Sequence, residues 1–530
     1  MTDTNTIARS SAIVAVGTAL SRVTGFFRVA AVAYALGVTT IAGVYSYANE
    51  TPNIVYELLL GGVLTATLVP FFVRQFEFDD ERGTNAVFTA AILALGGITL
   101  LGIAIAPWIV DVYTLRVEGA DRAQQQQLAT AFLRLFMPQI FFYGLTALAT
   151  GVLNARRRYA AAAFAPVLNN VVVVAVFLTL ARVAGDPVSV QRMLDDSLLV
   201  LLVGLGTTAG VAAMALALLP ALRRAGVHLR PVLDLRNHAV VHLLRLSGWS
   251  VGYVVANQVA LWVVLVLANG VDGGAFAYLA AYAFFQLPHG LFSVSIMTTL
   301  TPEMSSAAAR GDVEALRQRL SLGIRLVTVV VLPATAALVG LARPIVVGFL
   351  QRGAFDTAAS ALVSHTLALF ALGTLPFSIY LLTLRVFYAQ HDTRTPFLVN
   401  CVENGVNIAL AFPLFAWLGI PGLALAFSSA YVIGAAISLA TARVRLSGLD
   451  GRRIVHVAAR SALVAAAVGV LTWGIGRVVG FERPAAALVT VALGGIAAAG
   501  IFVLGAWVLR IQEVTGLRSM FTRTRDSEIV

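Results

Sequence analysis

Long apolar runs follow one another along this chain from near its first residue to near its last, and short clusters of arginine separate them. Each run is about 20 residues or longer, which is the length that a helix needs to cross a bilayer core of roughly 30 Å. Charged residues make up only 12% of the 530 residues, against roughly 25% in a typical soluble protein. We therefore predict a polytopic membrane protein.

The apolar runs predict about fourteen transmembrane helices and an all-α fold. A membrane β-barrel would instead show segments of about ten residues in which apolar and polar residues alternate. The expected spans lie near residues 11–36, 41–73, 86–110, 128–153, 161–182, 197–222, 240–268, 276–300, 318–341, 360–384, 396–417, 421–442, 459–479 and 485–509.

The basic residues fix an expected orientation. All 37 are arginine, and the formal net charge is +11. If the N-terminus is cytoplasmic, 26 arginines fall on the cytoplasmic side, 8 on the opposite side, and Arg22, Arg28 and Arg134 within spans. Because cytoplasmic loops of membrane proteins are enriched in basic residues, we expect both termini in the cytoplasm and no nucleic-acid partner. The polar lead Met1–Ser10 indicates no removable signal peptide.

Several classes of function are excluded by missing motifs. The lone Cys401 rules out an intramolecular disulfide and a CxxC metal site. The chain has neither a phosphate-binding G-x-x-x-x-G-K-[ST] loop nor an H-E-x-x-H zinc motif. No arrangement of a nucleophile and a base stands out either. We expect a protein that is not an enzyme and that carries no cofactor.

Two pairs of segments repeat at nearly the same separation. Thr67–Pro70 matches Thr299–Pro302, 232 residues later, and Asn154–Asn170 matches Tyr388–Asn404, 234 residues later. Chance similarity between helices rich in alanine and leucine is the alternative. Parallel repeats arrange around an axis normal to the membrane, with the substrate site between them. We predict two parallel six-helix repeats around a central cavity. On this prediction the two six-helix lobes lie at 1–225 and 226–455. A two-helix appendage follows at 456–510, and a cytoplasmic tail at 511–530.

Four charged side chains lie in the first two spans, where each costs about 2.5–3.5 kcal/mol if it faces lipid. Glu50, Asn53 and Glu57 are spaced so that they share one face of a helix. Arg22 and Arg28 are six residues apart on the span before. One interpretation is a polar cavity that receives an anionic group. The other is a set of Arg–Glu bridges between the helices, or arginines that reach the membrane interface.

A second polar stripe follows the eleventh span, at Asn400, Glu403, Asn404 and Asn407, and Asn257 lies on the seventh. Oxygen ligands on one helix face suit a sodium ion or a proton relay. Asparagines inside membrane helices also form hydrogen bonds between helices, and both interpretations stay open.

The motifs resemble those of a known family. The segment SRVTGFFR at 21–28 resembles the SRxxGFxR opening of the MurJ/MviN lipid II flippases, a branch of the MOP exporter superfamily. The composition is similar to that of actinobacterial members. The resemblance continues through Pro52–Asn53, Gly62, Val69–Pro70, Asn154, Phe164–Pro166, Asn170, Leu287–Pro288, Leu300–Pro302, Leu350–Phe355 and Phe387–Pro396.

The resemblance implies a lipid II flippase of the bacterial plasma membrane, which moves the lipid-linked peptidoglycan precursor to the outer leaflet by alternating access. In the family, spans 1, 2, 7 and 8 line a cationic cavity, and spans 13 and 14 form a groove for the polyprenyl tail. Arg22 and Arg28 would face the pyrophosphate.

The resemblance also suggests further contacts and partners. Glu50, Asn53, Glu57 and Gln286 are the remaining candidate contacts of the substrate. A sodium site in the family corresponds to Asn257, Asn400 and Asn404 here, so that sodium ions or protons are candidate coupling ions. Membrane lipids and cell-wall synthesis proteins are further candidate partners.

The chain departs from better-known members at four positions. It has Val29 and Gly43 where they carry acidic residues, and Tyr56 and Ala283 where they carry arginines. These losses point to a divergent paralogue as one possibility. The alternatives are therefore an exporter of another polyprenyl-linked saccharide, a small-solute antiporter of the same fold, and a non-transporting scaffold for cell-wall synthesis.

Overall fold

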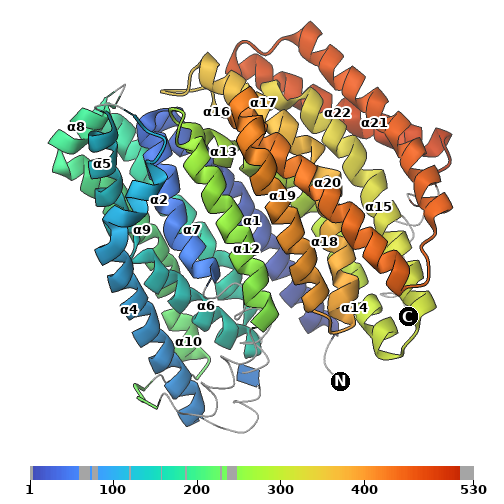
Figure 1. The fold of residues 1–530 in the computed structure, drawn as a ribbon, viewed down its shortest axis with the longest axis horizontal. Helices are drawn as coiled ribbons and strands as arrows, with labels where there is room; N and C mark the ends of the chain where they lie inside the picture. Colours follow the sequence, from blue (N-terminus) through green and yellow to red (C-terminus); the bar gives the residue numbers. More distant parts are fainter. Residues whose placement is uncertain are drawn as a thin grey trace. The chain divides into compact units, whose positions relative to one another are not determined.

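The computed structural model describes residues 4–58, 72–73, 81–118, 121–156, 158–185, 188–226, 230–234, 248–511 and 513. Within these residues every regular element is a helix (Figure 1), which confirms the all-α prediction. The first repeated segment, Thr67–Pro70, and the motif residue Gly62 lie outside the described residues, as does most of the tail.

The chain divides into two compact units, Met1–Phe276 with Gly353–Phe355, and Ala277–Arg352 with Asp356–Val530. The first contains α1 (Thr4–Leu36), α2 (Thr40–Tyr56), α4 (Glu81–Tyr113), α5 (Asp121–Phe136), α6 (Gln139–Ala155), α7 (Tyr159–Ala184), α8 (Val190–Asp195), α9 (Ser197–Leu216), α10 (Leu219–Arg224), α12 (Gly248–Ala268) and the start of α13 (Gly274–Pro288). The second contains the rest of α13, η3 (His289–Ser293), α14 (Val294–Ala309), α15 (Val313–Gly340), α16 (Ala342–Leu350), α17 (Thr357–Leu372), α18 (Thr374–Ala389), α19 (Arg394–Leu418), α20 (Ile420–Arg445), α21 (Gly451–Val479) and α22 (Pro484–Val508). The lobe boundaries at 225 and 455 stay a prediction.

The described helices account for nearly all of the expected spans. Twelve helical segments are long and apolar enough to cross a membrane, and the pair α17 and α18, bent by 44°, makes a thirteenth. The expected span at 41–73 begins as α2, and most of its remainder lies outside the described residues. The chain is thus a multi-pass membrane protein with a span count close to the expected fourteen.

One expected span is interrupted by a wide helical turn. The sequence predicts a single helix near 276–300, but a π-helical turn, η3, separates α13 from α14. Pro288 lies directly before it and has no backbone N–H to continue the α-helical pattern. His289 Nδ1 and Ser293 Oγ, at the two ends of η3, each lie 2.9 Å from Ser378 Oγ on α18. The wide turn therefore serves as a polar docking point for α18.

The second repeated pair shows a similar local arrangement in both units. In each copy a helix ends, a short turn follows, and the next helix carries a buried polar side chain. A Cβ atom on Gly210 of α9 would lie 2.6 Å from Asn169 Oδ1, and one on Gly434 of α20 would lie 3.0 Å from Glu403 Cγ. In both units, therefore, a glycine of the following long helix makes room for this side chain.

A charged cluster holds the turn between α18 and α19 against the end of α20. The Thr395 backbone N–H donates to Asp392 Oδ1 over 3.0 Å, and the Thr395 hydroxyl donates to Oδ2 over 2.6 Å. Arg445 pairs with the same carboxylate, and its guanidinium lies 5.3 Å from the ring centroid of Phe387. Partial burial raises the pKa of Asp392, but the bonds from Thr395 and Arg445 outweigh it and lower that pKa to about 2.

We expect Asp392→Asn to reduce stability at neutral pH but not in strong acid. The folded-state pKa lies below the ordinary value of 3.8, so the carboxylate stabilises the fold above about pH 4, and this contribution is lost as pH falls through about 2. The pair is partly exposed, so the loss should be below about 1 kcal/mol. The free energies of unfolding of the wild type and of Asp392→Asn, measured in detergent from pH 2 to pH 7, test this loss. A difference that is constant over this range would contradict the assignment.

The turn between α1 and α2 is held by backbone contacts that leave no room for side chains. The Ala354 N–H donates to the Tyr34 carbonyl over 3.0 Å. Gly37 has a φ of +64°, and a Cβ atom there would lie 2.2 Å from the Ala354 carbonyl oxygen. Glycine is required at this position both for its left-handed conformation and for the close approach.

Gly37→Ala should therefore destabilise the protein more than Gly185→Ala. Both glycines have a similar positive φ, but no atom of the described residues beyond its chain neighbours lies within 4 Å of a Cβ atom on Gly185. Gly185→Ala, the control, should lose only the roughly 1–2 kcal/mol that a left-handed backbone conformation costs a residue with a Cβ atom. Gly37→Ala adds a clash with the Ala354 backbone to this cost. Thermal unfolding of the two purified variants compares them, and equal losses would refute the close packing at Gly37.

Candidate functional site

The first span is fixed in rotation by one buried asparagine of α7. Asn170 Nδ2 donates to the Ser21 carbonyl over 3.1 Å and to Thr24 Oγ1 over 3.0 Å. A Cβ atom on Gly25 would lie only 3.5 Å from the same nitrogen. Because Ser21, Thr24 and Gly25 share one helix face, these contacts set the direction of the neighbouring side chains of α1.

Neither Arg22 nor Arg28 forms an ion pair in the part of the chain that the structure describes. Arg22 is exposed and Arg28 partly exposed. Neither has a carboxylate within 4 Å, and neither makes a hydrogen bond, among the described residues. Of the two sequence interpretations, Arg–Glu bridges between the first two spans are therefore not observed within this part. The arginines are available to bind an anion.

The polar residues of α2 form one continuous face. Glu50, Asn53 and Glu57 are each partly exposed, whereas most residues on the rest of α2 are buried. Asn53 Nδ2 donates to Glu50 Oε1 over 3.1 Å. Arg28 and Glu50 interact electrostatically without a direct contact. This face therefore presents carboxylate and amide groups in the neighbourhood of a cation.

Aromatic side chains support the surroundings of Arg28. The buried Tyr45 ring packs edge-to-face on Phe177 of α7, with ring centroids 4.9 Å apart. Tyr56 and Tyr143 of α6 pair at 5.2 Å. The charge of Arg28 acts on both Tyr45 and Tyr143. Two tyrosine hydroxyl groups thus lie within the electrostatic reach of the guanidinium.

The four departures from the family pattern occupy partly or fully buried positions. Val29, Tyr56 and Ala283 are partly buried, and Gly43 is fully buried. A Cβ atom on Gly43 would meet the backbone of Gly273 at 3.5 Å. The turn between α12 and α13 thus lies within van der Waals distance of a Cβ atom at position 43.

The remaining candidates lie apart from this site in the sequence and in part in the second unit. Gln286 Nε2 donates to the Tyr282 hydroxyl one turn earlier on α13 over 2.6 Å. Asn257, in the first unit, donates to the Tyr253 carbonyl over 2.9 Å. Asn404 donates to the Asn400 carbonyl over 3.0 Å. These three bonds each lie within one helix, and Asn400 Nδ2 also lies 3.5 Å from the Tyr380 hydroxyl of α18.

The stripe on α19 is buried and rich in oxygen atoms. Asn400, Glu403, Asn404 and Asn407 are each at most 6% exposed. Glu403 Oε2 and Asn407 Oδ1 accept no hydrogen bond among the described residues. Such oxygens suit a hard monovalent cation. No group of three histidine, cysteine, aspartate or glutamate side chains that suits a metal ion occurs within the described ranges.

Asn170 was not predicted as a site residue, although it lies in a repeat and in a motif of the sequence. A buried asparagine at the end of a repeated segment is a usable signal, because such a side chain needs a partner on another helix. The tyrosines near Arg28 carry no such signal, since aromatic residues are common in apolar spans.

Comparison with known proteins finds one family across most of the chain. The family model described as MurJ, lipid II flippase MurJ, matches residues 32–482. The probable lipid II flippase MurJ of Rhizobium meliloti (strain 1021) is 29% identical over 429 residues, 79% of this chain and 78% of that protein. The probable lipid II flippase MurJ of Vibrio cholerae is 27% identical over 485 residues, 88% of both.

Solved structures show the same fold. A lipid II flippase MurJ in an inward closed conformation superposes with a TM-score of 0.76 at 19% identity, covering 94% of this chain and 99% of that one. An inward-facing MATE family multidrug transporter of the MOP superfamily gives a TM-score of 0.64 at 14% identity, covering 80% and 94%. The family-model match begins after Arg22 and Arg28, so their role depends on the geometry of α1.

Removing the bonds of Asn170 should loosen α1 in steps. Hydrogen bonds between membrane helices contribute about 0.6 kcal/mol on average. We expect Thr24→Val, which removes one acceptor, to lose about that amount, and Asn170→Leu, which removes both bonds, to lose about twice as much. Unfolding free energies in mixed detergent micelles measure both variants. Two variants as stable as the wild type would show that Asn170 does not hold α1.

Proposed function

The chain belongs to the MurJ family of lipid II flippases, and on this premise we propose that Arg22 and Arg28 on α1 bind the diphosphate of the lipid that it moves across the membrane. The observation that carries this proposal is that neither guanidinium forms an ion pair or a hydrogen bond with a described residue. A guanidinium presents a planar fork of donors that matches phosphate oxygens.

The geometry of the first unit supports a proposal in which α1 and α2 contact different parts of the substrate. The arginines attract the anionic part. Glu50, Asn53 and Glu57 present acceptors on one face of α2, and they suit the hydroxyl and amide groups of a saccharide. In this proposal the Glu50 carboxylate, which interacts electrostatically with Arg28, also limits how tightly the diphosphate is held, so that it is released after crossing.

The remaining assignments extend the same proposal. Gln286 contacts the substrate from the eighth span, and both termini lie in the cytoplasm, as the arginine distribution predicts. Asn257, Asn400 and Asn404 are proposed sodium ligands, supported by the buried oxygens of α19. Coupling to protons and contacts with cell-wall synthesis proteins stay predictions.

Cells depleted of their own flippase test the role of the arginines. We expect the wild-type gene to restore lipid II in the outer leaflet, and Arg22→Ala and Arg28→Ala to fail. Loss of one charge-assisted hydrogen bond costs roughly 1.5–3 kcal/mol, or about a ten- to hundredfold weaker interaction. Arg22→Lys and Arg28→Lys should rescue in part, because lysine keeps the charge but loses the fork.

Arg134→Ala is the matched control, since Arg134 is also an exposed arginine of a span in the same unit but lies on α5. It should rescue like the wild type. Equal rescue by the Arg22 and Arg28 variants at normal expression would remove the proposed phosphate site. Dependence on Glu50 and Glu57 alone would instead favour a small-cation antiporter.

A further inference from the structure

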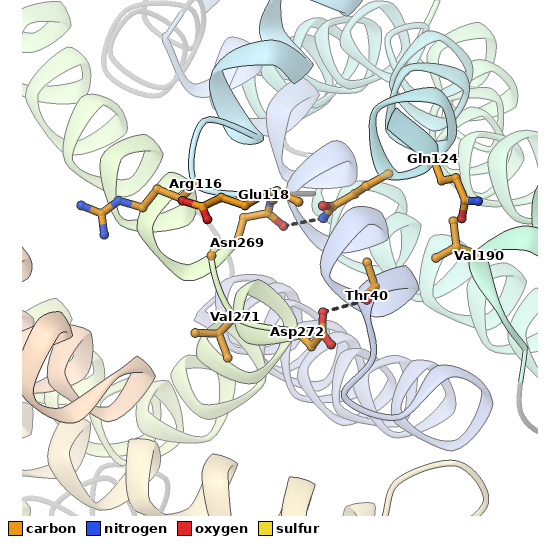
Figure 2. A pocket seen from close by; sticks show the side chains of 12 residues that line it. Thr40, Arg116, Glu118, Gln124, Val190, Asn269, Val271 and Asp272 are labelled. Carbon is orange, nitrogen blue, oxygen red and sulfur yellow. Dashed lines mark hydrogen bonds between the residues drawn. The ribbon is translucent and has the colours of Figure 1, made fainter. Parts of the chain in front are cut away.

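A polar cavity lies in the first unit, at the face where α1 ends, and it is separate from the arginine site. Its volume is about 480 Å³, within the range of small-ligand sites. Figure 2 shows side chains converging on it from the start of α2, the segments around the start of α5, α8 and the turn between α12 and α13. Four separate parts of the chain therefore build one pocket.

Hydrogen bonds between these parts hold the pocket in shape. Gln125 Nε2 donates to Asn269 Oδ1 over 3.1 Å, and Asn269 Nδ2 donates to the Tyr113 carbonyl over 2.9 Å. Thr40 Oγ1 donates to Asp272 Oδ1 over 2.9 Å (Figure 2). Gln125 and Asn269 are 4% and 6% exposed. The amide pair thus forms a fixed floor rather than a mobile surface.

The described lining carries a net negative charge, which disfavours anions. Among these lining residues the ionisable side chains are Glu118, Asp272 and Arg116, which sum to one negative charge. Figure 2 shows the Arg116 guanidinium directed away from Asn269 and Asp272. Gln124 adds a further amide, and none of the described lining residues is aromatic. Carboxylates only accept hydrogen bonds and amides both accept and donate, so the fitting ligand is hydrophilic, uncharged or amine-bearing, and rich in donors.

We propose that this pocket binds the saccharide–peptide part of a lipid-linked headgroup, through its hydroxyl, amide and amine groups, at the face to which the lipid is delivered. The inference rests on the proposed function, since that supplies the orientation and the substrate class. It adds a further site for the saccharide–peptide part, apart from the polar face of α2, whereas the arginines of α1 take the phosphates.

Occupancy of the pocket also stabilises the contacts that build its walls. A ligand that contacts both the α12–α13 turn and the start of α5 adds hydrogen bonds between the two segments that the Gln125–Asn269 hydrogen bond already joins. A ligand binds more tightly to the conformation in which its contacts exist and shifts the population toward it. Headgroup binding in this pocket therefore favours the conformation in which the α12–α13 turn and the start of α5 are in contact.

Binding of a soluble headgroup fragment to the full-length protein in lipid nanodiscs tests the proposal. The probe is the disaccharide–peptide without diphosphate and polyprenyl tail, measured by titration calorimetry. We expect saturable binding that inorganic diphosphate does not displace. Val190→Trp, which fills the pocket, and the double variant Glu118→Gln/Gln124→Ala should each weaken it at least tenfold. Glu118 and Gln124 are exposed and make no hydrogen bond to another described residue, so the double variant should fold normally.

Two controls separate this site from the arginine site. Val183→Trp introduces the same bulk at an exposed position of α7 outside the lining and should bind like the wild type. Arg22→Ala should also keep full binding of the fragment, even where it fails to restore outer-leaflet lipid II. Absence of saturable binding to the wild type, or binding that Val190→Trp leaves unchanged, overturns the proposal. Loss of binding in Arg22→Ala overturns it as well, because the fragment would then occupy the arginine site.

Discussion

The structure of the first unit depends on how two guanidinium groups are kept in a membrane-spanning helix. Each costs about 2.5–3.5 kcal/mol if it faces hydrocarbon, and no described carboxylate pairs with either. Water or an anionic ligand must therefore compensate them. The packing of α1 on α7 through Asn170 sets the direction in which they project. A helix held by fixed hydrogen bonds keeps its charges in place without neutralising them.

Recognition of a lipid-linked saccharide needs opposite chemistry at its two polar parts. Guanidinium groups suit the phosphates, whereas carboxylates and amides suit hydroxyl groups and amines. The first unit contains both kinds of surface: Arg22 and Arg28 on α1, and the acidic, amide-rich pocket beside Asn269. The polar face of α2 is intermediate in its chemistry. Glu50 accepts a hydrogen bond from Asn53, and it also interacts electrostatically with Arg28. Separate surfaces for the two parts allow one to release while the other still binds.

The length of the apolar runs and the spacing of the arginine clusters between them were enough to predict the helices and most spans. Both are set by the thickness of the bilayer that each helix must cross. The short helix α16 and the turn η3 were not predicted. The first is an apolar nine-residue segment that adjoins a span, and the second depends on the docking of His289 and Ser293 on Ser378. The pocket at Asn269 was missed for a related reason. Its residues come from turns far apart in the sequence, and no single segment shows a pattern.

Solvent access to position 28 tests most directly whether the α1 arginines face water and substrate. In a Cys401→Ala background, Arg28→Cys should react with a water-soluble methanethiosulfonate reagent, and polyprenyl diphosphate should slow that reaction. Phe27→Cys, next to it and 57% exposed, should show no such protection. An unreactive thiol at position 28, or equal protection at both positions, would contradict the account.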